Sequence, residues 1–490
     1  MNTQWNIVPR SHDDLVMQLL VNRGVAPADR EVFLSPNWET GTYSPFAFTR
    51  MQEAVDAMFG ALERSEPIVI HGDYDADGVS GSSLLFGALT DIAEHLKFTL
   101  NLDVFLPDRE KDGYGVAMHT IERCIAEGKK LIVTVDCGIA NGLELNRAHE
   151  AGVATIVCDH HQLGAHFPDH AIILHPLAPG ETYPNKTLCG TGVAFKFASG
   201  LITEARKRGA DFPEGYEKWM LDLVAIATVT DVMPLTGENR VLEYFGLKVL
   251  NKTRRAGIRA ILAASGTELG GIDTQVIGFR IGPRLNAAGR LSSAKIAFDT
   301  IVASTTAEAE SAAGALEQLN RDRQNIFKAS YKQAEAIAKD MLDEHQVLVV
   351  ASEAWLPGIV GLIAGKLVND FGRPAFALTK IEGKYVGSGR TAGGLHLVDA
   401  MNACGDIFLR KGGHPQACGL SMLSMTEIDL FRSRVNDFAR EKFGSAGVSP
   451  SLKIDAVVAP STITMDLLAT IEACAPFGEG NRPPVFATMG

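Results

Sequence analysis

Acidic and histidine side chains follow three short apolar runs in the first half of the sequence. HGDYDADG (residues 71–78) follows PIVI, DCG (136–138) follows KLIVTV, and DHH (159–161) follows ATIVC. Carboxylate oxygens suit hard divalent cations, and imidazole nitrogens shift the preference towards manganese and its neighbours over calcium. These residue types therefore indicate a site for divalent metal ions.

The donors are numerous enough for two ions. Asp75 and Asp77 are one residue apart, so both side chains leave the same face of an extended chain, and at a turn they can reach neighbouring ions. Asp231, which follows LDLVAIATVT, is a further candidate beside Asp136 and His160. Two ions about 3.5–4 Å apart clamp both oxygens of an in-line phosphoryl displacement, and a water bridging them is acidic enough to attack phosphorus.

The same aspartates also suit a plainer role, since a carboxylate at a helix N-cap satisfies free amide donors. Burying five or six acidic groups together would cost many kcal/mol without cations, and this favours the metal site over capping. Asp73 and Asp159 either orient ligands through hydrogen bonds or cap helices. His161 is either a phosphate contact or a structural histidine, and we predict that it acts in catalysis with Asp75 and Asp136.

The elements that must position these residues form a repeating pattern. From Pro67 onward, short β-branched runs alternate with helical stretches, which predicts a βαβ series and a parallel sheet. In such sheets ligands bind outside the carboxyl ends of the strands. Three strand ends are therefore expected to converge on one acidic cluster.

The rest of the chain divides by composition. Residues 307–344 are rich in Ala, Glu, Gln, Lys and Arg, with no Pro, which predicts a long helix; QVLVVA then begins a second α/β unit, and EKFGSAGVSPS is expected to be a linker. The expected segments are a lead segment (1–45), a sheet domain (46–305), a connecting helix (306–345), a second domain (346–445) and an incomplete third domain (446–490).

Bulk properties exclude several classes. The 490 residues are 46% hydrophobic, which allows more than one core, and we expect a soluble cytoplasmic protein because the N-terminus resembles no signal peptide and no apolar run is long enough to span a membrane. Seven cysteines without a C-x-x-C pair argue against disulfides and structural zinc. The net charge of −12 requires any contact with nucleic acid to be local.

In this order, HGDYDADG, VTVDCG, VCDHH and ATVTDVMPL resemble the four motifs of the DHH phosphoesterase superfamily. PDREKDGYG, GFRIGPRLNAAGRL, WLPGIVGLIAGKL, GSGRT and GGH are similar to segments of its RecJ family. The resemblance implies a single-stranded-DNA-specific 5′-to-3′ exonuclease that releases 5′-mononucleotides with two Mn²⁺ or Mg²⁺ ions and acts in DNA recombination and repair. It implies the metal ligands His71, Asp75, Asp77, Asp136, His160 and Asp231, with Asp136 bridging the ions.

The resemblance also implies residues that bind substrate. Ser388, Arg390 and His414 would face the DNA backbone, and Arg109 would help to hold the 5′ end. An arginine fork suits phosphate oxygens, and the glycines of GSGR and KGGH let backbone amides approach an anion; ordinary glycine turns with a solvated arginine are the alternative. Arg284, Asn286 and Arg290 are further candidates, which could form a phosphate-lining loop; for the two arginines, buried ion pairing is the alternative. Tyr114 could stack on a base.

The expected fold is α/β. A parallel-sheet DHH domain is joined by a long helix to a second α/β domain, called DHH-associated, and the start of an OB-fold domain follows. Single-stranded DNA is the expected partner of a monomer, with a single-strand-binding protein and a helicase as possible further partners and no membrane. The rival functions are a small-substrate phosphoesterase acting on nanoRNA, phosphoadenosine phosphate or pyrophosphate, a non-catalytic replication scaffold, and a nucleic-acid-binding module without hydrolysis.

Overall fold

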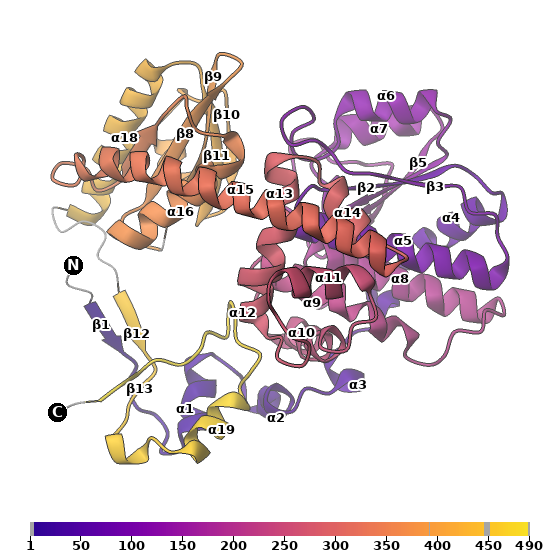
Figure 1. The fold of residues 1–490 in the computed structure, drawn as a ribbon, viewed down its shortest axis with the longest axis horizontal. Helices are drawn as coiled ribbons and strands as arrows, with labels where there is room; N and C mark the ends of the chain where they lie inside the picture. Colours follow the sequence, from indigo (N-terminus) through magenta and orange to yellow (C-terminus); the bar gives the residue numbers. More distant parts are fainter. Residues whose placement is uncertain (1–3, 392, 445–450, 489–490) are drawn as a thin grey trace. The chain divides into compact units, whose positions relative to one another are not determined.

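The computed structural model describes residues 4–391, 393–444 and 451–488. The chain forms two compact units (Figure 1). The larger unit comprises Arg10–Asn320, Val458–Pro484 and Thr488–Gly490. The smaller unit comprises Met1–Pro9, Arg321–Val457 and Val485–Ala487.

A five-stranded parallel sheet forms the centre of the larger unit, in the order β3-β2-β4-β5-β6. This is the sheet that the βαβ pattern predicts. All residues of β2 and β4 are buried, as expected for strands covered on both faces. The strands are β2 (Ile68–Gly72), β3 (Leu102–Phe105), β4 (Leu131–Val135), β5 (Ala154–Cys158) and β6 (Ile172–Leu174).

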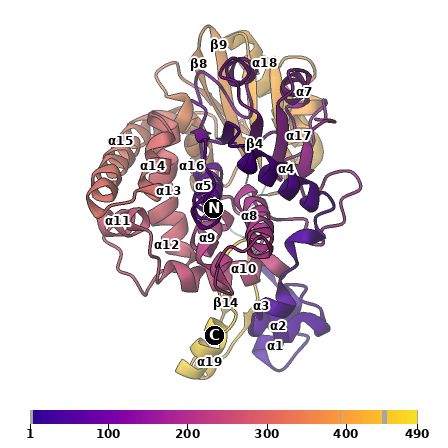
Figure 2. The same cartoon turned by 90° about the vertical axis from the view of Figure 1, so that its right-hand side faces the viewer.

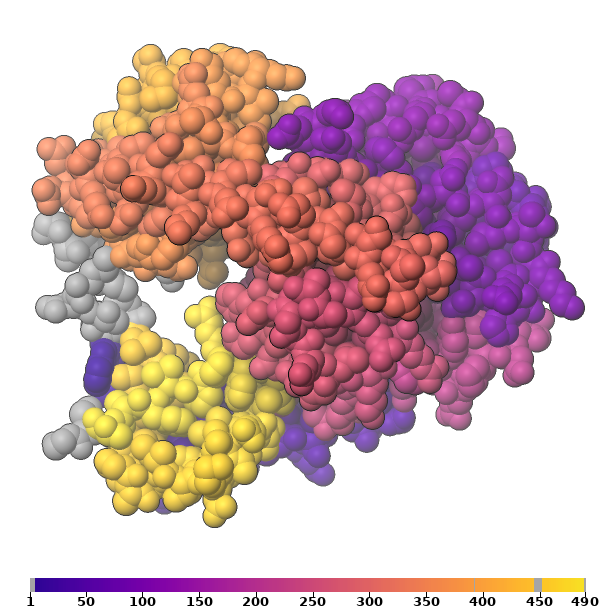
Figure 3. Space-filling view, in the orientation of Figure 1, coloured from indigo at the N-terminus to yellow at the C-terminus, as the bar shows by residue number. Residues whose placement is uncertain are grey.

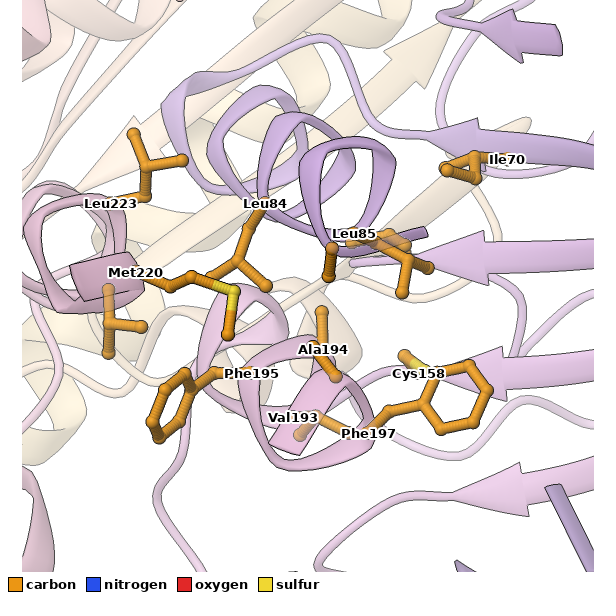
Figure 4. Close-up of a cluster of buried hydrophobic side chains, with 14 of the residues drawn as sticks. Ile70, Leu84, Leu85, Cys158, Val193, Ala194, Phe195, Phe197, Met220 and Leu223 are labelled. Carbon is orange, nitrogen blue, oxygen red and sulfur yellow. The ribbon is translucent and has the colours of Figure 1, made fainter. Parts of the chain in front are cut away.

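Alternate residues of these strands pack against helices on opposite faces (Figure 1). Ile70 and Val133 join a core with α4 (Met51–Glu63), α5 (Ala76–Leu96) and α8 (Gly190–Lys207). In Figure 4, Leu85 of α5 lies next to Ala194 of α8 in this core. The other face is covered by α6 and α7, whose bounds are Met118–Ala126 and Gly142–Glu150.

Helices complete the larger unit. Helix α9 is buried almost all round and packs between α8 and α10, with α11 to α14 gathered to one side (Figure 2). A π-helical turn, η4 (Ile277–Ile281), leads directly into α13. The other helices of this unit are α1 (Leu15–Asn22), α2 (Arg30–Leu34), α3 (Trp38–Gly41), α9 (Leu221–Thr230), α10 (Gly237–Leu250), α11 (Ala256–Ala264), α12 (Thr274–Val276), α13 (Gly282–Leu291), α14 (Lys295–Val302) and α19 (Met465–Glu472).

The predicted long helix is α15 (Thr306–Lys339), whose 34 residues span about 50 Å. Ala313 and Leu316 of its first half are buried in the core of the larger unit. Ala334 and Ala338 of its second half are buried in a core of the smaller unit. The side of α15 that faces solvent is seen in the space-filling view (Figure 3).

The smaller unit contains a mixed five-stranded sheet in the order β10-β11-β9-β8-β7, in which only the β7–β8 pair is parallel. Helix α18 begins at a capping box formed by Ser424 and Glu427. The elements are β7 (Leu348–Ala351), α16 (Val360–Phe371), β8 (Ala375–Ile381), β9 (Lys384–Arg390), α17 (Leu397–Ala403), β10 (Arg410–Gly413), β11 (Ala417–Met422) and α18 (Met425–Phe443).

Two short parallel strand pairs complete the description. In the smaller unit, β1 (Gln4–Ile7) pairs with β12 (Ser451–Ile454), and β13 (Ala456–Val457) pairs with β14 (Phe486–Ala487). The β1–β12 pair joins the start of the chain to the predicted third domain, which the sequence did not indicate. Part of the predicted linker, residues 445–450, lies outside the described residues. The predicted fold class is confirmed, and the exact domain boundaries remain predictions.

Among the described helices, none combines the length and apolar character needed to cross a membrane.

Candidate metal centre

The predicted ligands meet at the carboxyl-end edge of the parallel sheet. Strand β2 leads to Asp73 and Asp75, β4 to Asp136, and β5 to His160. Their ligand atoms form three groups, and within each group all atoms lie within 4.8 Å of one another. The groups are Asp136, His160 and His161; Asp77, His160 and Asp231; and Asp73, Asp75 and Asp136.

Capping and ligand roles coincide at the start of α5. Asp75 is the N-cap, and its Oδ1 accepts hydrogen bonds from the amides of Asp77 (2.9 Å) and Gly78 (3.2 Å). Asp77 is held by the N-terminus of α8, where the amides of Gly190 and Thr191 donate to its two carboxylate oxygens at 2.8 and 2.7 Å. Both carboxylates are therefore fixed in orientation before any ion binds.

The backbone takes unusual conformations at or beside two of the predicted ligands. Asp136 has a φ of +63°, and Val232, next to Asp231, has a φ of +57°. The left-handed region is unfavourable for a β-branched residue, and such strain gathers at functional sites. A Cβ on Gly190 would lie 2.5 Å from the Cβ of Asp136, so only glycine allows α8 to approach this ligand so closely.

His160 is surrounded by carboxylates. Its Nε2 lies 3.2 Å from Oδ1 of Asp136, 3.4 Å from Oδ2 of Asp231 and 3.8 Å from Oδ2 of Asp77. Burial and the charge of His161 lower the pKa of His160 to about 4. The ring is therefore neutral at pH 7, which is the form that binds metals.

His161 differs from its neighbour because it pairs with Asp159. Oδ1 of Asp159 accepts from Nδ1 of His161 (2.9 Å) and from both histidine amides, while Oδ2 accepts from the amide of Ile139 (2.9 Å). Burial opposes protonation of His161, but the bond to Asp159 raises the pKa of His161 to about 9. Asp159 thus orients the histidine pair, one of the two roles left open by the sequence.

His71 and Asp73 are both buried at the end of β2. Burial lowers the pKa of His71 to about 4, and its Nδ1 lies 3.7 Å from the thiol of Cys137. The structure brings Asp73 within ligand distance of Asp75 and Asp136, although the sequence suggested only an orienting or capping role for it.

The donor set fits divalent cations. Five buried atoms at this edge make no hydrogen bond to any described residue: Nε2 of His71, Oδ1 of Asp73, Oδ1 of Asp136, Nε2 of His160 and Oδ2 of Asp231. Burial, followed by repulsion between neighbouring carboxylates, raises the pKa of Asp73, Asp136 and Asp231 well above the usual value. Cations would satisfy these atoms and stabilise the ionised carboxylates.

Two predicted substrate residues border this centre. Tyr114 is 46% exposed, its hydroxyl lies 3.4 Å from the carbonyl oxygen of Asp136, and its ring centroid lies 5.1 Å from that of His161. The guanidinium of Arg109 lies 5.2 Å from the ring centroid of Tyr74. Tyr74 was missed by the sequence analysis, although its place between Asp73 and Asp75 in HGDYDADG was a usable signal.

The three residues predicted in a phosphate-lining loop lie instead on a helix, α13, so the prediction of a loop was wrong. Arg284 is buried and forms an ion pair with Glu317 at 2.7 Å, the alternative stated for it above. Oδ1 of Asn286 accepts a hydrogen bond from the amide of Ala76 at 2.8 Å. Burial raises the pKa of Tyr74, and the charge of Arg290 is one of the contributions that oppose this rise. Contacts of these three residues with substrate remain predictions.

The remaining predicted substrate residues belong to the smaller unit. Ser388 and Arg390 are two residues apart, so they lie on the same face of β9, and both approach the first turn of α16. A Cβ on Gly361 would lie 3.0 Å from Nη2 of Arg390 and 3.5 Å from Oγ of Ser388. His414 is exposed in the turn between β10 and β11. A guanidinium and a hydroxyl beside a helix N-terminus form a suitable anion site.

Comparison with known proteins agrees with this organisation. The model of the DHH family, N-terminal domain, matches residues 67–228, that of the DHHA1 domain matches residues 344–441, and that of the RecJ OB domain matches residues 454–490. The solved structure of RecJ from Thermus thermophilus in complex with Mn²⁺ has a TM-score of 0.82 at 27% identity and covers 99% of this chain and 69% of that chain.

Two similar proteins are named single-stranded-DNA-specific exonuclease RecJ. The one from Bacillus subtilis is 37% identical over 99% of this chain, which spans 59% of that protein's length. The one from Escherichia coli is 30% identical over 98% of this chain, which spans 84% of its length. The resemblance seen in the sequence motifs is confirmed: the chain belongs to the RecJ family of DHH proteins.

Proposed function

We propose that this chain is a metal-dependent exonuclease that degrades single-stranded DNA from the 5′ end and releases 5′-mononucleotides. The observation that carries the proposal is the convergence of buried carboxylate and imidazole atoms, without hydrogen bonds to described residues, at one edge of the parallel sheet. The names of the relatives supply the substrate, and the Mn²⁺ complex of the Thermus protein supplies the class of ion.

Two Mn²⁺ or Mg²⁺ ions would activate the attacking water and neutralise charge on the phosphate when bound. Asp75, Asp77, Asp136, His160 and Asp231 would hold them, with His71 as an added ligand and Asp136 shared between the ions.

The chain's own groups complete the chemistry. The raised pKa of His161, about 9, favours the protonated ring at neutral pH, and Asp159 occupies its Nδ1, so Nε2 would face the reacting phosphate. This cationic ring would contact a phosphate oxygen and stabilise charge that develops there. Gly190 and Thr191 keep Asp77 in place through its two oxygens, so the ligand does not need to reorganise during the reaction.

Substrate binding is assigned to both units. Arg390, Ser388 and His414 would bind backbone phosphates, and the position of Arg390 and Ser388 beside the N-terminus of α16 supports this assignment. Arg109 would hold the 5′ end and Tyr114 would stack on a base, as exposed aromatic residues do in single-strand sites.

Other features of the proposal rest on the family resemblance or on the sequence alone. A role in DNA recombination and repair, a single-strand-binding protein and a helicase as partners, a monomeric state and a cytoplasmic location remain predictions.

A substrate panel tests the proposal against its rivals. With Mn²⁺, the protein should degrade single-stranded DNA and leave blunt duplex DNA intact. Hydrolysis restricted to a dinucleotide or phosphoadenosine phosphate would instead favour the small-substrate phosphoesterase. Failure to hydrolyse any of these, with single-strand binding retained, would favour a scaffold or a binding module.

A further inference from the structure

We propose that Asn286 is a positioning residue of the metal centre, which fixes the turn that carries Asp75 and Asp77 rather than contacting substrate. The role of Asn286 in catalysis depends on the proposed function, which this inference extends. The hydrogen bond from the amide of Ala76 to Oδ1 of Asn286, 2.8 Å long, joins residues 210 positions apart in the sequence.

This bond satisfies an amide donor at the start of α5 that Asp75 does not reach. The first amides of a helix have no partner within the helix, so other groups must satisfy them. Asp75 accepts from the amides of Asp77 and Gly78, but it does not bond to the amide of Ala76. Asn286 accepts from that remaining amide, so three successive donors are fixed by two side chains.

A second observation shows that α13 packs directly against the turn of residues 74–78. A Cβ on Gly289, one helical turn after Asn286, would lie 2.3 Å from the carbonyl oxygen of Tyr74. Only glycine permits this approach, because the atom in the way belongs to the backbone. Asn286 and Gly289 therefore contact two residues of the same turn, Ala76 and Tyr74.

The position of this turn determines where two carboxylates point. Oδ1 of Asp75 is occupied by two amides, so the other oxygen remains for an ion, and its direction depends on the backbone of residues 74–78. Asp77 is held separately by α8. Without Asn286 the amide of Ala76 would seek another acceptor, and the spacing of Asp75 and Asp77 would change. Metal sites are sensitive to such shifts.

Asn286→Ala tests the inference directly, with Mn²⁺ binding in the absence of DNA as the main readout. Residues that orient metal ligands usually alter affinity or activity by about 10- to 100-fold when replaced. We expect Asn286→Ala to weaken Mn²⁺ binding within that range, measured by titration calorimetry or by the electron paramagnetic resonance signal of free Mn²⁺. Asn286→Asp keeps an acceptor oxygen and should recover most of the affinity.

Asn251→Ala is the matched control. Oδ1 of Asn251 accepts from the amide of Ile272 at 2.8 Å, so this variant loses the same kind of bond in the same unit. It also loses two bonds that Nδ2 of Asn251 donates to the carbonyl oxygens of Leu247 and Ile272. Asn251→Ala should lose at least as much thermal stability in EDTA as Asn286→Ala, but only Asn286→Ala should lose Mn²⁺ affinity.

Three outcomes would overturn the inference. Unchanged Mn²⁺ affinity in Asn286→Ala together with a raised KM for DNA would make Asn286 a substrate contact, as first predicted from the sequence. If Asn286→Ala changed neither the Mn²⁺ affinity nor the KM for DNA, or if Asn251→Ala lost as much Mn²⁺ affinity, Asn286 would have a structural role only. The Mn²⁺ measurements do not require hydrolysis, so an inactive wild-type protein would contradict the proposed function without deciding the role of Asn286.

Discussion

Nε2 of His160 and Oδ1 of Asp136 lie 3.2 Å apart, yet neither atom makes a hydrogen bond within the described part of the chain. The ring is neutral at pH 7 because its pKa falls to about 4, and burial raises the pKa of the carboxyl group. Buried polar atoms without hydrogen bonds are costly, and a cation bound to both atoms would offset this cost. This pair is therefore one place where we expect the proposed ions to bind.

Replacement of the shared ligand gives the first prediction. Asp136→Ala should lower hydrolysis of single-stranded DNA by at least about 100-fold, because loss even of a residue behind the ligands costs about 10- to 100-fold. Mn²⁺ should raise the melting temperature of the wild-type protein by mass action and raise that of the variant much less. Wild-type activity in Asp136→Ala would contradict the two-metal mechanism.

Arg390 should act on binding more than on chemistry. Hydrogen bonds to charged groups contribute about 1.5–3 kcal/mol, so Arg390→Ala should raise the Kd for single-stranded DNA by roughly 10- to 100-fold and change kcat less. Arg390→Lys keeps the charge but loses the planar fork, and should restore only part of the affinity. Arg440→Ala, an exposed arginine of α18, serves as control. Equal effects of the two alanine variants would contradict the assignment of Arg390.

A buried glutamate gives a pH-dependent prediction. Glu243 is fully buried on α10, neither carboxylate oxygen has a hydrogen-bond partner among the described residues, and burial raises its pKa well above the usual value. The folded protein therefore keeps a proton that the unfolded chain loses above its pKa of about 4.3. The stability of the wild type relative to Glu243→Gln should fall as pH rises from about 5 to 8.

The Glu243 effect is measurable by melting at several pH values. Glu243→Met, which leaves no buried polar group, should be more stable than the wild type by roughly 1–3 kcal/mol at neutral pH, with a smaller difference near pH 5. Glu53, whose pKa is lowered by its bond to Arg50, is the control, and Glu53→Gln should not become relatively more stable as pH rises. A pH-independent difference for Glu243 would mean that this carboxyl group is not buried as described.

Arg240 connects distant parts of the larger unit. This buried guanidinium donates to the carbonyl oxygens of Phe33 (2.8 Å), Ala475 (2.7 Å) and Pro476 (3.2 Å), and lies over the ring of Phe33. Arg240→Met keeps much of the volume but leaves three carbonyl groups without their donor. It should destabilise the unit by at least about 3 kcal/mol, measured by urea unfolding.

Lys248→Met on the same helix is the control for Arg240, because Lys248 is exposed and its replacement should change stability by less than about 0.5 kcal/mol. A loss of similar size in both variants would show that α10 itself, rather than the Arg240 bonds, is sensitive to replacement.

The larger sheet and its acidic edge were predictable because both depend on local pattern. β-branched runs mark buried strands, and parallel strands bring their carboxyl ends together, so His71, Asp136 and His160 could be placed at one edge from the sequence alone. The long helix followed from composition. These features require no knowledge of which distant side chains meet.

The remaining features depend on long-range contacts that no local pattern marks. The pairing of β1 with β12 joins two four-residue segments at opposite ends of the chain. The ion pair of Arg284 with Glu317, and the bond of Asn286 to Ala76, depend on how α13 packs. An arginine or asparagine in a glycine-containing phrase suits a phosphate contact equally well, so the sequence could not distinguish these roles.

Product analysis on single-stranded DNA labelled at the 5′ or the 3′ end, with Mn²⁺ or with EDTA, tests the central claim most directly. We predict that the 5′ label is released first as a mononucleotide, that the 3′-labelled strand shortens progressively, and that EDTA and Asp136→Ala each stop both reactions. Early release of the 3′ label, internal cleavage, or hydrolysis that persists in EDTA would contradict a metal-dependent exonuclease acting from the 5′ end.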